Sequence, residues 1–271
     1  MSGSQYFSIG SLLHGQRTEH VNINGVDIEY RRAGSPRADR DMVMLHEGLG
    51  STSLWRDFPE RLACAARAHV LVYSRRGYGS STALDGPRNV DYLHQEARIQ
   101  LPALLRHFRI ASPILFGHSD GASIALIYAA QQENTPRAVI ALAPHVKVED
   151  LTVRSIEGLG SAFESSRLRM RLARHHTDVD GAFWGWNRIW LHPQFRNWNI
   201  ESLLSKIRCP VLAIQGMEDE YGTLEQVNSI ARGVANAKVI PLVGCRHSPH
   251  REQPEQVLTA TCNFLDHCLP Q

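Results

Sequence analysis

The sequence predicts an α/β protein with a mostly parallel central sheet and helices on both faces. Short apolar runs such as 42–45 and 138–143 alternate with longer stretches of helical periodicity, which is typical of buried parallel strands joined by crossover helices. Another such run stops at Gly117, and a helical stretch of small residues follows at once. A length of 271 residues accommodates one large domain of this kind, with or without an insertion.

The first 143 residues supply six of the expected strands. Apolar and polar residues alternate from His20 to Tyr30 around Asn24-Gly25, which predicts a β-hairpin with a tight turn. Pro102 lies inside a long helical pattern and predicts a kink there, because proline cannot donate a backbone hydrogen bond. The further strands are expected at 42–45, 69–74, 114–117 and 138–143, and the helices at 54–66, 89–108 and from 120 to about 132.

The alternation lapses after the sixth strand. Residues 144–209 show helical patterns without a convincing buried strand, and they contain four of the five tryptophans. Strand and helix patterns then resume at 211–215, 224–234, 238–242 and 254–268. We therefore expect a core domain made of 1–143 and 210–271, with 144–209 inserted as a helical cap, or lid.

Composition excludes several classes of protein. The 29 basic and 27 acidic residues nearly balance, so nothing indicates a nucleic-acid surface. No apolar run approaches the roughly 20 residues of a membrane helix, and Met1 to Gly10 lacks the pattern of a secretory signal. The five cysteines are scattered, which favours free thiols in a reducing cytoplasm. No cofactor is expected, and the oligomeric state is left open, a homo-oligomer included.

The segment Gly117-His118-Ser119-Asp120-Gly121 carries the main indication of chemistry. A serine between two glycines, after a strand and before a helix, is the layout of a nucleophile elbow. The turn brings strand and helix backbones so close that side chains at positions 117 and 121 would collide. The pattern predicts that Ser119 lies at the apex of the turn.

Three more strand ends carry residues that could assist a serine. In a parallel sheet these ends meet at one edge. A serine hydroxyl needs a base, and the base needs a carboxylate to fix its tautomer. Ser119, Asp219 and His247 occur in the chain order of such a triad. The backbone N–H of Asp120 and one from the loop 46–50 could stabilise a negative tetrahedral intermediate. The three strand ends are followed by His46-Glu47-Gly48, Gly216-Met217-Glu218-Asp219-Glu220 and Gly244-Cys245-Arg246-His247.

Together these motifs resemble those of the α/β-hydrolase fold enzymes, over nearly the whole chain. The resemblance implies that Ser119 is the nucleophile, Asp219 the orienting acid and His247 the base. Glu47 stands where this family usually has a glycine, which makes Gly48 the expected oxyanion donor and places a charge near the pocket mouth. Arg246 also stands where many relatives have glycine.

Several residues allow a second interpretation. Glu218 or Glu220 could replace Asp219, and His250 could be mistaken for His247. Neither His175-His176 nor the segment 178–181 has a complete ligand set, so no metal site is expected. Two further pairs stay open: Trp184 and Trp186 are core residues or pocket walls, and Arg75 and Arg76 are loop charges or ligands for a substrate carboxylate.

The expected function is a cytoplasmic serine hydrolase that cleaves a small-molecule ester through an acyl-enzyme. On the same fold, hydrolysis of a lactone or of a C–C bond in a vinylogous diketone is an alternative. A ligand-binding protein that keeps the triad but turns over slowly is the alternative outside enzymes. Nothing in 144–209 distinguishes among the substrates.

Overall fold

The computed structural model describes all residues except 1–16, 36, 132–135, 166 and 270–271. The prediction for Met1 to Gly10 therefore lies outside the described residues, as does the predicted helix end near 132. The described part of the chain forms an eight-stranded sheet with the order β1-β2-β4-β3-β5-β6-β7-β8. The strands are β1 (Glu19–Ile23), β2 (Val26–Ala33), β3 (Arg40–Leu45), β4 (Ala68–Tyr73), β5 (Ile114–His118), β6 (Ala138–Leu142), β7 (Val211–Gly216) and β8 (Ala237–Leu242).

Only the first strands of this sheet are antiparallel. β1 and β2 form the predicted hairpin, and Asn24 and Gly25 adopt φ values of 54° and 82° in its turn. β2 pairs antiparallel with β4, and every remaining neighbour is parallel. The carboxyl ends of β3, β5, β6, β7 and β8 therefore meet at one edge, where the motifs of the sequence lie.

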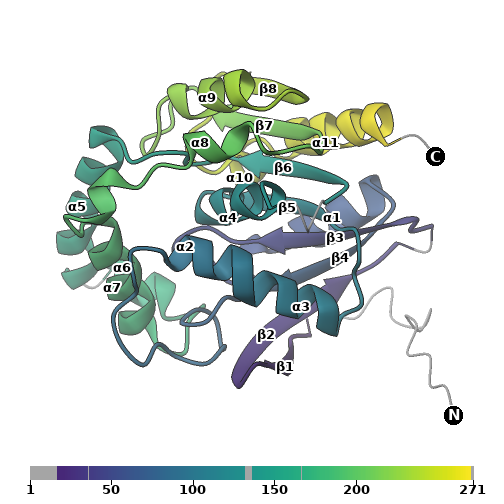
Figure 1. The fold of residues 1–271 in the computed structure, drawn as a ribbon. Coiled ribbons are helices and arrows are strands. Elements are labelled where there is room, and N and C mark those ends of the chain that lie inside the picture. The colour runs from purple at the N-terminus through teal and green to yellow at the C-terminus, as the bar shows by residue number, and fades with distance from the viewer. Residues whose placement is uncertain (1–16, 36, 132–135, 166, 270–271) are drawn as a thin grey trace, which may run out of the picture.

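Helices cover both faces of the sheet (Figure 1). Met42 and Met44 point to the face covered by α1 (Phe58–Ala65) and α11 (Pro254–Cys268), whereas Val43 and Leu45 point to the other. That second face carries α2 (Tyr92–Gln95), α3 (Leu101–His107), α4 (Asp120–Ala129) and α9 (Glu225–Gly233). Apolar residues on both sides of each strand explain the unbroken apolar runs in the sequence.

The helix predicted at 89–108 has an interruption. A π-helical turn, η2 (Glu96–Gln100), connects α2 to α3 directly before Pro102. Pro102 has no N–H to donate and its ring crowds the preceding turn, so the regular ladder cannot continue through it. The predicted kink thus takes the form of a wider turn.

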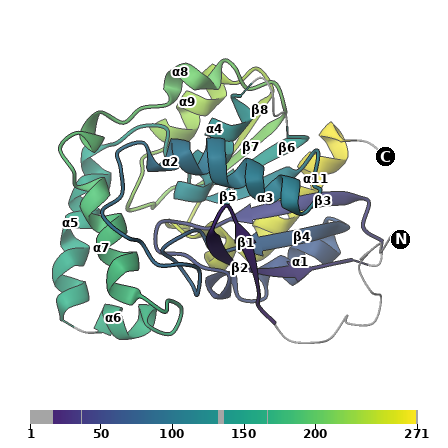
Figure 2. The same ribbon diagram turned by 60° about the horizontal axis from the view of Figure 1, so that its bottom comes forward.

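Between β6 and β7 the described residues contribute helices but no strand of the sheet. Figures 1 and 2 place α5, α6 and α7 together on one side of the sheet. Their own apolar cluster consists of Phe163, Leu172, Val179 and Phe183. The helices of this segment are α5 (Asp150–Glu164), α6 (Arg167–Leu172), α7 (Val179–Trp190), η3 (Phe195–Asn197) and α8 (Glu201–Leu204). This arrangement confirms the predicted fold class, including a helical insertion after the sixth strand.

Candidate active site

Ser119 lies at a strained turn between β5 and α4. Its backbone has φ 52° and ψ −118°, values that a residue with a side chain rarely adopts. A Cβ added to Gly117 would come within 2.4 Å of the Gly121 carbonyl oxygen, and one added to Gly121 within 2.1 Å of the Leu45 oxygen. The two glycines therefore let the strand, the turn and the neighbouring strand β3 pack together. Ser119 is only 6% exposed.

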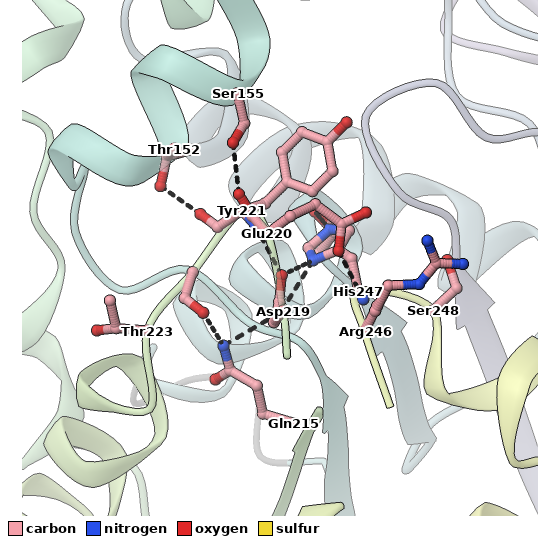
Figure 3. Close-up of polar contacts among 12 residues, drawn as sticks. Thr152, Ser155, Gln215, Asp219, Glu220, Tyr221, Thr223, Arg246, His247 and Ser248 are labelled. Atoms are coloured by element: carbon pink, nitrogen blue, oxygen red, sulfur yellow. Dashed lines mark hydrogen bonds and ion pairs between the residues drawn. The ribbon is translucent and has the colours of Figure 1, made fainter. Parts of the chain in front are cut away.

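His247 and Asp219 reach Ser119 from the ends of β8 and β7. The Nε2 atom of His247 lies 3.0 Å from Ser119 Oγ. Its Nδ1 atom lies 2.8 Å from Oδ1 and 3.0 Å from Oδ2 of Asp219 (Figure 3). Nδ1 must carry a proton to donate to the carboxylate, so in neutral His247 the unprotonated Nε2 faces the serine hydroxyl.

Several hydrogen bonds hold Asp219 in place. Gln215 Nε2 donates to Asp219 Oδ2 at 3.2 Å, and the Tyr221 N–H donates to Oδ1 at 2.8 Å. Two hydroxyls of α5 bind the same loop: Thr152 Oγ1 donates to the Tyr221 carbonyl, and Ser155 Oγ donates to that of Glu220 (Figure 3). The inserted helices thus help to fix the carboxylate that faces His247.

The two neighbouring glutamates have different contacts. Glu218 accepts a hydrogen bond from the Cys245 N–H at 2.8 Å. Glu220 accepts one from the backbone N–H of His247 at 3.3 Å, and the described contacts link neither carboxylate to the imidazole ring. The geometry therefore favours Asp219 over both alternatives that the sequence leaves open.

The electrostatic environment couples Asp219 to His247. Burial by itself raises the pKa of Asp219, but the neighbouring imidazole and the Tyr221 N–H bring it below its ordinary value. Burial lowers the pKa of His247, but Asp219 and then Glu220 raise it above its ordinary value. His145 is the opposite case, because burial lowers its pKa to about 3 and keeps that ring neutral.

His250 lies in a separate cluster behind His247. It packs against Trp55 at a centroid distance of 4.6 Å and against His118 at 4.9 Å. His118 Nε2 donates to the His247 carbonyl oxygen at 2.7 Å, and its Nδ1 lies 3.5 Å from Glu47 Oε2. His247, and not His250, is therefore the histidine that contacts Ser119. The Glu47 carboxylate lies against His118, with 21% of the side chain exposed.

The expected oxyanion donors are the backbone N–H groups of Gly48 and Asp120. In the part of the chain that the structure describes, neither the Gly48 nor the Asp120 N–H has an acceptor within hydrogen-bond distance. Asp120 lies at the first position of α4, where backbone N–H groups have no partner inside the helix. An oxyanion site requires backbone N–H groups without another acceptor, so Gly48 and Asp120 remain the candidates for it.

The comparisons with known proteins bear on this arrangement. The model of the Alpha/beta hydrolase family matches residues 42–260. The chain belongs to this family. The hydrolase is 24% identical over 260 residues to Serine hydrolase BPHL of Homo sapiens, covering 90% of this chain and 85% of that one. It is 22% identical to the sn-1-specific diacylglycerol lipase ABHD11 of Xenopus laevis, and the match covers 95% of this chain and 90% of that one.

Solved structures share the fold of the hydrolase. The enol-lactonase from Burkholderia xenovorans superposes with a TM-score of 0.71 at 20% identity, covering 91% of this chain and 99% of that one. The CarC serine hydrolase involved in carbazole degradation superposes with a TM-score of 0.73 at 20% identity, and the match covers 93% of this chain and 99% of that one. Family and fold together make the chain an α/β hydrolase.

The two tryptophans singled out as pocket walls lie in different places. Trp186 of α7 packs onto the loop after β3, so that a Cβ added to Gly48 would come within 2.0 Å of its Nε1. Trp184 contacts Phe163 and Phe183 inside the inserted segment, and Arg188 stacks on its ring at 5.3 Å. Of the two, the structure brings only Trp186 against a residue of the candidate site.

Sequence reasoning missed other residues around Ser119. Trp190 Nε1 donates to Asp120 Oδ1 at 3.2 Å, and Tyr221 and His145 lie with ring centroids 4.7 Å and 5.8 Å from that of His247. His145 follows β6 at the same sheet edge, so the strand-end rule could have found it. Arg75 lies in the loop after β4, as expected, but it is 1% exposed and is therefore not a solvated surface charge.

The remaining polar motifs have structural partners in the hydrolase. Asp178 caps α7 by accepting the Gly181 N–H, and Asp180 pairs with Arg169. His176 accepts the Gly79 N–H at 3.0 Å and donates to the Leu49 carbonyl oxygen, also at 3.0 Å. Among the described residues no group of three metal-ligating side chains occurs. In the described part of the chain, no helix is long and apolar enough to cross a membrane.

Proposed function

We propose that this hydrolase cleaves the ester bond of a small molecule through an acyl-enzyme, with Ser119 as nucleophile, His247 as base and Asp219 as the acid that orients it. The observation that carries the proposal is the continuous contact from Asp219 Oδ1 through both ring nitrogens of His247 to Ser119 Oγ, at 2.8 Å and 3.0 Å. This arrangement supplies an activated nucleophile without a metal or cofactor.

The reaction follows from the positions of these atoms. Ser119 Oγ attacks the ester carbonyl while His247 Nε2 takes the hydroxyl proton, and Asp219 stabilises the imidazolium. The oxyanion accepts hydrogen bonds from the Gly48 and Asp120 N–H groups. His247 then protonates the leaving alkoxide, which departs and leaves an acyl-enzyme. Water, deprotonated by His247, attacks that ester and releases the acid and free Ser119.

The surroundings of Ser119 support a small substrate. The serine is 6% exposed, and Trp186, Trp190 and Tyr221 contact Gly48, Asp120 and His247 of the candidate site. Such aromatic surroundings favour a small molecule over a folded partner. We also propose that residues 144–209 act as a cap over a core made of 1–143 and 210–271. The helices of that segment, with their own apolar cluster, support this division.

Labelling with a fluorophosphonate and hydrolysis of p-nitrophenyl acetate test the proposal together. We expect the phosphonate on Ser119 by mass spectrometry, and loss of at least about 10³-fold in kcat for Ser119→Ala and for His247→Gln. His192→Gln, which changes an exposed histidine, is the control and should keep wild-type turnover. Wild-type turnover in a folded Ser119→Ala protein would exclude this mechanism.

A substrate panel then defines the bond that is cleaved. Simple esters, lactones, prolyl anilides and vinylogous diketones cover the bonds that a serine hydrolase of this fold could attack. The proposal predicts the highest kcat/KM for an ester. A stoichiometric burst without further turnover on every compound would instead favour a slowly reacting ligand-binding protein.

A further inference from the structure

Arg75 is a buried cation beside the candidate oxyanion site. It follows β4 by two residues, and 2% of its side chain is exposed. A guanidinium is always charged in proteins, so its burial requires several acceptors nearby. Its described acceptors are the carbonyl oxygens of His46 and Glu47 and the carboxylate of Asp120. The last two of these acceptors adjoin the two proposed oxyanion donors.

The first adjoining group is the peptide that joins Glu47 to Gly48. Arg75 Nη2 donates to the Glu47 carbonyl oxygen at 2.9 Å, and the Gly50 N–H donates to it at 3.1 Å. The same oxygen lies 2.7 Å from His46 Nδ1. The Arg75 N–H donates to His46 Nε2 at 3.0 Å, so the ring proton is on Nδ1 and that contact is a third donor.

Three donors on one carbonyl have a consequence for the N–H of the same peptide. The described chain contains no cis peptide bond, so the Gly48 N–H points away from the Glu47 carbonyl. The donors therefore fix the plane of this peptide with the N–H on its opposite side. They also withdraw electron density from the peptide, which makes the Gly48 N–H a stronger donor.

The second adjoining group is the side chain of Asp120. Its carboxylate is buried, and its backbone N–H is the other proposed donor. A negative charge there would oppose a developing oxyanion. Tyr92 donates to Asp120 Oδ2 at 2.7 Å and Trp190 to Oδ1 at 3.2 Å, while Arg75 Nη2 lies 3.8 Å from Oδ2. Of these three groups, only Arg75 carries an opposite charge.

We propose that Arg75 is the positioning residue of the oxyanion hole, because it fixes and polarises the Glu47–Gly48 peptide and balances the Asp120 carboxylate beside the second donor. This inference rests on the proposed function, since it concerns the transition state of that reaction. Arg75 does not touch the substrate; it acts through the Gly48 N–H and through Asp120. Its effect is largest where negative charge develops, so it concerns kcat more than KM.

A comparison of Asp120→Asn with the double variant Arg75→Met/Asp120→Asn isolates the peptide contribution. The single change Arg75→Met leaves a buried carboxylate without its cation and could unfold the protein, whereas the double variant removes both charges. Against Asp120→Asn, we expect the double variant to lose about 10- to 100-fold in kcat, less than removal of a whole oxyanion donor costs. KM should change by less than about 3-fold.

A pair of inhibitors gives a readout that general loss of structure would not produce. A trifluoromethyl ketone forms a tetrahedral oxyanion on Ser119, and the matching methyl ketone serves as the ground-state analogue. In the double variant, the affinity for the trifluoromethyl ketone should fall by the same factor as kcat. The affinity for the methyl ketone should stay nearly unchanged. Arg76→Met is the matched control, because Arg76 is the neighbouring residue and pairs with Asp85 at the surface. It should behave as wild type.

The outcomes separate this inference from the proposed function. A double variant as fast as Asp120→Asn, with unchanged affinity for the trifluoromethyl ketone, would overturn the role of Arg75 while leaving the serine mechanism intact. Equal weakening of both inhibitors would also overturn it, because it would indicate a general distortion. Wild-type protein that neither hydrolyses esters nor accepts a phosphonate on Ser119 would overturn the proposed function itself.

Discussion

The indole ring of Trp186 lies directly over the backbone of Gly48. A Cβ at position 48 would come within 2.0 Å of the Trp186 Nε1 atom, closer than any real contact. One residue belongs to the loop after β3 and the other to α7 of the inserted segment. The shape of the candidate oxyanion loop is therefore tied to the packing of the helices inserted after β6.

Gly48→Ala should lower kcat/KM by displacing either the ring or the loop. A shift near 1 Å in an active site can cost about 100-fold, so we expect a loss of about 10- to 100-fold in ester hydrolysis. The Trp186→Leu background is the control, since the smaller side chain leaves room for the new methyl group. The same loss in both backgrounds would show that the contact with Trp186 is not the cause.

Asp219→Asn should leave the fold intact and reduce kcat by about 10³- to 10⁴-fold, because an amide cannot hold His247 in the reactive tautomer. Glu218→Gln and Glu220→Gln are matched changes in the same loop, and their kcat values should stay within about 10-fold of wild type. Steady-state kinetics on one ester measures all three. A larger loss from Glu220→Gln than from Asp219→Asn would move the role of the acid to Glu220.

The pH profile should identify His247 as the base. Asp219 and Glu220 raise the pKa of His247 above its ordinary value despite the opposing effect of burial. A base acts only when it is unprotonated, so kcat/KM should fall as pH decreases through this raised pKa. Glu220→Gln removes one of the negative charges that raise it and should move the acidic limb to lower pH.

Glu218→Gln is the control for that profile, because the Glu218 carboxylate binds the Cys245 N–H instead. Its acidic limb should coincide with that of the wild type. An acidic limb that stays in place in Glu220→Gln, or moves to higher pH, would contradict the assignment of this limb to His247.

Alanine at Gly121 should destabilise the fold, because its Cβ would lie 2.1 Å from the Leu45 carbonyl oxygen and the strand backbone cannot move aside. We expect the free energy of unfolding in urea to fall by about 1–3 kcal/mol or more. Gly158 in α5 is the matched control, since nothing lies within 4 Å of a Cβ there. Gly158→Ala should raise stability by about 0.5–1 kcal/mol. Similar changes at both positions would refute the steric argument.

Much of the fold and several features of the candidate site follow from local sequence. Buried parallel strands appear as unbroken apolar runs because both faces of the sheet are covered, and the hairpin follows from Asn24-Gly25. The elbow at Ser119 is predicted because only glycine fits the crowded positions 117 and 121. The helix containing Pro102 was predicted with a kink, but the π-helical form of that kink depends on the packing of its flanking turns.

The sequence by itself determined the fold class, the helical insertion after the sixth strand and the candidate residues at the strand ends, because periodicity and backbone sterics act over a few neighbouring positions. Only the tertiary structure decided which partners meet. It pairs Asp219 and not Glu218 or Glu220 with the ring of His247, 28 positions away, and it lays Trp186 on Gly48. It also buries Arg75 between the two proposed oxyanion donors. Such contacts depend on strand order and on how the inserted helices pack, which no local pattern encodes.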